Sequence, residues 1–226
     1  MKICTLKKTA LITLITLSST IGAYASNSTL DTIKLMDIAG KQRMLSQRIA
    51  KDYMYAGKNI AVSKAKRQLA SSLKELKDAH NKLTESINNP EIVNLLVFVA
   101  MSSEDFEETA KDEFSTDNAQ LILDLSESML EGSEYVVDSL KKTSGVKESK
   151  IVDLAGRQRM LSQRIAKYYI AYQSGIKDKN TVDQMKKAVK AFTATHSQLM
   201  ANETNTPEIN RELNKIDRLW KIVYKF

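Results

Sequence analysis

Two arginines, Arg43 and Arg159, have the type and spacing to do chemistry, because they occupy the same place in two nearly identical segments. Residues 38–53 return as residues 154–169 with thirteen of sixteen positions identical, at an offset of 116. A guanidinium is permanently charged and presents a planar set of N–H donors. Two guanidiniums brought together repel each other unless an anion lies between them, and their shape suits a small oxyanion or a carboxylate.

Helical spacing divides each segment into two faces. One face of the first segment is an apolar stripe, which we expect to pack into the core of its own module. This stripe consists of Ile38, Leu45, Ile49 and Tyr53. The other face carries a glycine, which costs about 1 kcal/mol relative to alanine in mid-helix and indicates close approach by another helix. We expect the two motif helices to pack face to face about a pseudo-two-fold axis. The candidate ligand-binding residues are Gly40, Arg43, Met44 and Gln47 in the first copy and Gly156, Arg159, Met160 and Gln163 in the second.

The same face has a plainer interpretation as a structural interface. Residues 102–138 carry twelve acidic side chains and one basic side chain, Lys111, and we expect much of this acidic segment to be helical. Salt bridges between it and the motif would occupy the arginines without any ligand. Arg48 and Arg164 lie off the candidate face, and for both we predict solvent exposure or ion pairs.

The two histidines of the chain, His80 and His196, also stand at an offset of 116, each on an apolar helical stripe. No second ligand lies three or four residues away in a recognised metal-binding pattern. We therefore predict core histidines with hydrogen-bonded rings, no metal and no other cofactor. No Ser/His/Asp group or pair of buried carboxylates can be named, so we predict that the protein is not an enzyme.

Only seven glycines and two prolines interrupt 226 residues, which favours an all-α fold. Apolar spacing predicts helices over 31–56, 61–88, from 90 onward and over 116–142, followed by 149–174, 179–202 and 207–224. Pro90 and Pro207 mark the same helix start in each copy, and the fourth helix has no counterpart in the second. Short connections predict antiparallel neighbours, and hence one or more antiparallel helical bundles built from two tandem copies.

The first 25 residues resemble an export signal, with three lysines, an apolar run over 9–17 and a small-residue cleavage site at 23–25. The uncharged stretch over 9–25 is marginal for an uncleaved membrane anchor. We expect a signal peptide at 1–25, a first module at 26–145, a second module at 146–226, and a periplasmic or secreted protein. Removing the signal lowers the formal charge from +7 to +4, and we predict no nucleic-acid partner.

The segment Ala-Gly-(Lys/Arg)-Gln-Arg-Met-Leu-Ser-Gln-Arg-Ile-Ala-Lys, present in both copies, resembles the signature of the PilJ-type sensor domain. This family comes from type IV pilus chemotaxis transducers and is related to nitrate/nitrite-sensing domains. The resemblance implies an antiparallel helical bundle. Nitrate-binding members hold the anion between the motif helices of two subunits, which implicates Arg43 and Arg159, with Gly40 and Gly156 permitting the approach.

Family receptors also have transmembrane helices and a cytoplasmic signalling region, which this sequence does not show, so a membrane-bound receptor or kinase is the expected partner. Two hypotheses follow. The first is an exported sensory protein that binds a small anion such as nitrate or nitrite between the motif helices. The alternative is a ligand-free helical module that binds another protein of the cell envelope. Pairing of the motif helices within one chain and pairing in a homodimer both remain open.

Overall fold

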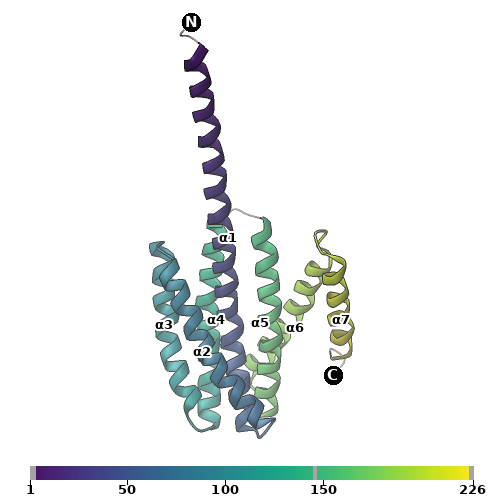
Figure 1. Cartoon of the computed structure of the whole chain (residues 1–226). Helices are drawn as coiled ribbons and strands as arrows, with labels where there is room; N and C mark the ends of the chain where they lie inside the picture. Colours follow the sequence, from purple (N-terminus) through teal and green to yellow (C-terminus); the bar gives the residue numbers. More distant parts are fainter. Residues whose placement is uncertain (1–3, 145–146, 224–226) are drawn as a thin grey trace.

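The structure, a computed structural model, describes residues 4–144 and 147–223 and consists of seven helices in that part of the chain (Figure 1). The first module contains α1 (Cys4–Gly57), α2 (Val62–Ser86), α3 (Pro90–Lys111) and α4 (Thr116–Ser144). The second contains α5 (Lys147–Gln173), α6 (Lys179–Met200) and α7 (Pro207–Val223). Every regular element in the described residues is helical, which confirms the predicted all-α bundle of two tandem modules.

Polar side chains explain where two of the helices, α3 and α6, begin. Asn89 caps α3, because its side chain accepts hydrogen bonds from the backbone N–H groups of Glu91 and Ile92, and Pro90 takes the first helical position. Asp178 caps α6 by accepting from the backbone N–H of Thr181 at 2.9 Å. These starts agree with the spacing seen in the sequence.

The core of the first module lies among α1, α2, α3 and α4. Leu45, Ile49 and Tyr53 of α1 are buried with Phe106 of α3 and Ile122 of α4 in one apolar cluster. The predicted stripe of the motif helix therefore faces its own module. In the second module α5 packs on α6, and α7 contacts α6 alone among the described helices.

The two modules join through their first helices. α1 packs against α5, which places the two motif segments side by side in one chain (Figure 1). α1 begins at Cys4, far ahead of the predicted start at residue 31. Its N-terminal half projects beyond the bundle (Figure 1). Residues 1–3 of the predicted signal and the predicted module boundary between residues 145 and 146 lie outside the described residues. None of the described helices is long and apolar enough to cross a membrane.

Candidate functional site

The motif helices α1 and α5 meet at Gly40 and Gly156, a place that we call the glycine crossing. A Cβ atom added to Gly40 would lie 3.9 Å from the Cα of Gly156, and one added to Gly156 would lie 3.8 Å from the Cα of Gly40. Larger side chains at these positions would hold the two backbones apart. A Cβ at either position would make ordinary van der Waals contact with the opposite backbone, so the crossing has space for alanine but not for a longer side chain.

Two reciprocal ion pairs connect the helices beside the glycine crossing. Arg43 of α1 donates to Asp153 of α5 at 2.9 Å, and Arg159 of α5 donates to Asp37 of α1 at 2.6 Å. Both the arginines and the aspartates are related by the repeat offset of 116. Each motif therefore gives its arginine to the other motif's aspartate, in the arrangement expected of a pseudo-two-fold axis.

The two guanidiniums converge on one point. The Nη2 atom of Arg43 lies 3.2 Å, and that of Arg159 3.8 Å, from the position that a Cβ of residue 156 would occupy. The structure thus brings together Arg43, Arg159, Gly40 and Gly156. Their charges are balanced by carboxylates of the chain, an arrangement that sequence reasoning missed, although the matched Asp37 and Asp153 were visible in the repeat.

The two halves of this arrangement differ in burial. The side chain of Arg43 is only 3% exposed and also lies 3.8 Å from Glu134 of α4, whereas that of Arg159 is 48% exposed. Burial alone would raise the pKa of Asp153, but Arg43 and Lys141 outweigh it and hold that pKa below its ordinary value. Asp153 is therefore a carboxylate at neutral pH. The plainer interpretation is correct in part, since Arg43 does face the acidic helix α4.

The other four candidate residues make contacts of a different kind. Met160 is buried with residues of α4 and α6, and Met44 packs against the same cluster. Gln47 donates to the backbone carbonyl of Ser126 at 2.9 Å, and Gln163 accepts from Lys51 at 2.9 Å. These side chains contribute to the packing of the motif helices against each other and against α4 and α6.

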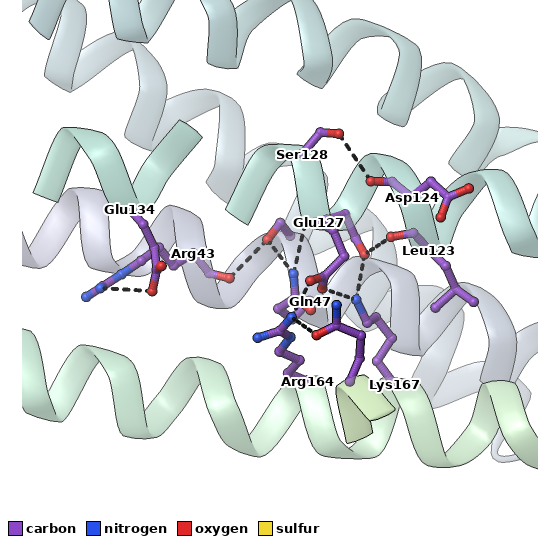
Figure 2. A network of polar contacts seen from close by, with 12 residues as sticks. Arg43, Gln47, Leu123, Asp124, Glu127, Ser128, Glu134, Arg164 and Lys167 are labelled. Atoms are coloured by element: carbon purple, nitrogen blue, oxygen red, sulfur yellow. Dashed lines mark hydrogen bonds and ion pairs between the residues drawn. The ribbon is translucent and has the colours of Figure 1, made fainter. Parts of the chain in front are cut away.

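A second polar cluster lies one to two turns beyond Arg159 along α5 (Figure 2). The ammonium group of Lys167 is fully buried and donates to Glu127 at 2.6 Å and to Ser126 at 2.8 Å. Arg164 pairs with the same Glu127, so of the two alternatives predicted for this arginine, solvent exposure or an ion pair, the structure shows the ion pair. Burial would raise the pKa of Glu127, but the two cations outweigh it and lower that pKa. Sequence analysis missed Lys167, although the repeated Ala-Lys step marked its position.

The pH dependence of stability should report on this lysine. Burial lowers the pKa of Lys167 to about 8, although Glu127 opposes the shift, whereas an ordinary lysine has a value of 10.5. Between these pH values the unfolded chain binds the proton and the folded chain does not, so the contribution of Lys167 to stability rises with pH. The free energy of unfolding of the wild type, minus that of Lys167→Met, should increase by about 1.4 kcal/mol per pH unit at most. Urea denaturation at pH 7.5, 8.5 and 9.5 measures this difference, and a flat or falling difference would contradict the assignment.

The repeated histidines differ in burial, since His80 of α2 is half-buried and His196 of α6 is buried. Among the described residues no three His, Cys, Asp or Glu side chains are grouped so as to hold a metal ion. His196 is buried beside Phe192, and neither of its ring nitrogens has a hydrogen-bond partner, so the predicted hydrogen-bonded ring is wrong here. Burial lowers the pKa of His80, which favours the neutral ring.

The described residues form a helical bundle with a duplicated motif, and one known protein family matches this chain. The PilJ family, described as the N-terminal part of type IV pili methyl-accepting chemotaxis transducers, matches residues 24–96 and 143–225. The chain belongs to this family, as the motif resemblance predicted. The match places it among the sensory domains of chemotaxis transducers. No curated protein and no solved structure matches the chain.

Proposed function

We propose that this protein is an exported sensory module that binds a small oxyanion, of the nitrate or nitrite type, at the glycine crossing. In this proposal Arg43 and Arg159 hold the anion, while Gly40 and Gly156 allow the helices to approach closely enough for both guanidiniums to reach it. A membrane-bound receptor or kinase then reads the bound state, in keeping with the family's place in chemotaxis transducers.

The reciprocal pairing of the arginines carries the proposal. Asp153 and Asp37 present to the guanidiniums the same kind of negatively charged planar oxygen pair that a small oxyanion presents. In this structure the two carboxylates thus occupy the arginines. An anion that replaces them would break both ties between α1 and α5 and would change how the two modules are held together. Ligand exchange of this kind supplies the differential contacts that a sensory transition needs.

Thermal unfolding in the presence of anions tests the proposal. At a nitrate or nitrite concentration ten times the dissociation constant, binding to the folded chain should stabilise it by about 1.4 kcal/mol. For a chain of this size that is an increase in Tm of about 3–5 °C. Chloride at the same ionic strength should give a smaller shift. Arg43→Ala combined with Arg159→Ala should abolish the difference, whereas Lys74→Ala, which removes an exposed ion pair on α2, should leave it unchanged.

Replacing both aspartates distinguishes anion binding by the arginines from a purely structural role of the two ion pairs. Asp37→Asn combined with Asp153→Asn removes the competing carboxylates, so the affinity for the anion should rise by at least about tenfold, which is 1.4 kcal/mol of binding free energy. If the two ion pairs only hold α1 and α5 together, the same variant loses stability and no anion restores that stability. That outcome, or the absence of any shift across a panel of oxyanions and carboxylates, would overturn the proposal.

A further inference from the structure

We infer that the second module binds a fourth helix supplied by a partner protein, an amphipathic helix with an acidic polar side, where α4 covers the first module. The inference does not depend on anion binding, since it rests on two faces that are buried in the first module and exposed in the second. One face belongs to α7 and the other to α5.

The apolar pattern of α7 matches that of α3 at an offset of 117, but its environment differs. Ile92, Leu96, Val99 and Phe106 of α3 are all buried, in clusters that include residues of α4. Their counterparts in α7 are Ile209, Leu213, Ile216 and Val223. Phe106 is fully buried, whereas Val223 is 59% exposed, and neighbouring Leu219 is 62% exposed. No residue of α7 is buried among those described.

Contacts of Trp220 nevertheless hold α7 against α6. Trp220 packs against Phe192 of α6 with ring centroids 4.3 Å apart, and its indole N–H donates to Thr193 at 3.0 Å. The helix thus lies along α6 at the edge of the molecule (Figure 1), and its remaining apolar residues stay exposed. An exposed apolar stripe of this length on an anchored helix is typical of a binding surface.

The matching face of α5 is also uncovered. On α1, Ala39, Arg43 and Ser46 are buried, and Arg43 and neighbouring Gln47 contact residues of α4. Their counterparts on α5, at an offset of 116, are Ala155, Arg159 and Ser162, and all three are exposed. The difference in exposure between the two motif arginines therefore has one cause: α4 covers Arg43, and none of the described helices covers Arg159 in the same way.

Charge identifies the kind of helix that fits. α4 carries six acidic side chains and two lysines, and its Glu134 lies 3.8 Å from Arg43. α6 and α7 together carry eight basic and four acidic side chains, and Arg159 stands where Arg43 stands in the first module. An acidic helix with a carboxylate opposite Arg159 complements this surface. A second copy that docked through this same surface would instead bring two basic surfaces together, which is unfavourable.

A labelled synthetic peptide with the sequence of residues 116–142 is the probe, because that helix covers the equivalent face in the first module. Fluorescence anisotropy with the full chain should show saturable binding. Ile216→Lys and Leu219→Lys should each weaken binding at least tenfold, and since both side chains are well exposed these variants should fold. Met101→Lys, at an exposed apolar residue of α3, is the matched control and should have no effect.

A double-mutant cycle identifies the ion pair. Arg159→Ala in the chain and Glu134→Gln in the peptide should each weaken binding severalfold, and the combination should cost no more than either change alone. Absence of binding overturns the inference. Binding that Ile216→Lys and Leu219→Lys leave undiminished also overturns it, because the peptide would then be replacing the chain's own α4. Sedimentation that shows self-association abolished by these two variants would assign the surface to a second copy and would equally overturn the partner helix.

Discussion

Glu127→Gln is expected to lower the free energy of unfolding by about 3 kcal/mol, because it leaves the ammonium group of Lys167 buried without a counter-charge. Glu127 is the carboxylate that both Lys167 and Arg164 reach across from α5 to α4 (Figure 2). Glutamine keeps the size of the side chain and can accept one hydrogen bond, but it cannot neutralise two cations. The uncharged groups that then remain beside the lysine are the glutamine amide, Ser126, an acceptor at 2.8 Å, and the Tyr168 ring, whose centroid is 4.3 Å from the ammonium nitrogen.

Urea denaturation followed by circular dichroism measures this loss. Glu131→Gln, at an exposed carboxylate one turn further along α4, is the matched control and should change stability by less than about 0.5 kcal/mol. The combination of Glu127→Gln with Lys167→Met should recover part of the loss, because the buried charge is then gone. A loss below about 1 kcal/mol in the single variant would show that Lys167 does not need this counter-charge.

Gly156→Leu should be the second most disruptive change, with a loss of about 2–3 kcal/mol. A Cβ at this position already lies 3.8 Å from the Cα of Gly40, so the rest of a leucine side chain has no space before the opposite backbone. The helices α1 and α5 must separate to admit it, and both reciprocal ion pairs then lengthen. We expect the same variant to lose any anion-dependent increase in Tm.

Gly156→Ala is the control for this prediction. Its Cβ would lie 3.2 Å from the Nη2 atom of Arg43, the flexible end of a long side chain that can move by a few tenths of an ångström. The gain in helix propensity of about 1 kcal/mol should offset that adjustment, so stability should change little. Thermal and urea denaturation of the two variants compare them directly. Equal losses for alanine and leucine would mean that chain flexibility, and not the approach of the helices, explains the glycine.

Arg159 belongs both to a reciprocal ion pair and to the uncovered face of α5. Arg159 reaches Asp37 across the glycine crossing, while the face of α5 to which it belongs is open to solvent. A partner helix with a carboxylate on this face would compete with Asp37 for the guanidinium. Binding of that helix and binding of an anion are therefore expected to influence each other, with equal coupling in both directions.

Local patterns in the sequence determined most of the fold. The starts at Pro90 and Pro207, the apolar stripes and the 116-residue repeat predicted the helices after α1 to within two residues at nearly every boundary. The glycine on the motif face indicated where another helix approaches. A mid-helix glycine costs about 1 kcal/mol relative to alanine whatever the tertiary structure, so its presence can be recognised in the sequence alone. The position of Arg43 and Arg159 on that face followed from the same periodicity.

Only the tertiary structure decided which charges meet. Arg43 and Arg159 have nearly identical neighbours in sequence, yet one is buried against α4 and the other is half exposed. Lys51 and Lys167 are likewise equivalent, yet only Lys167 is fully buried against Glu127. An ion pair forms when a carboxylate comes within about 4 Å, and that distance depends on how separate helices pack. Periodicity along one helix carries no information about it, so the repeat predicted the residues of the site but not their partners.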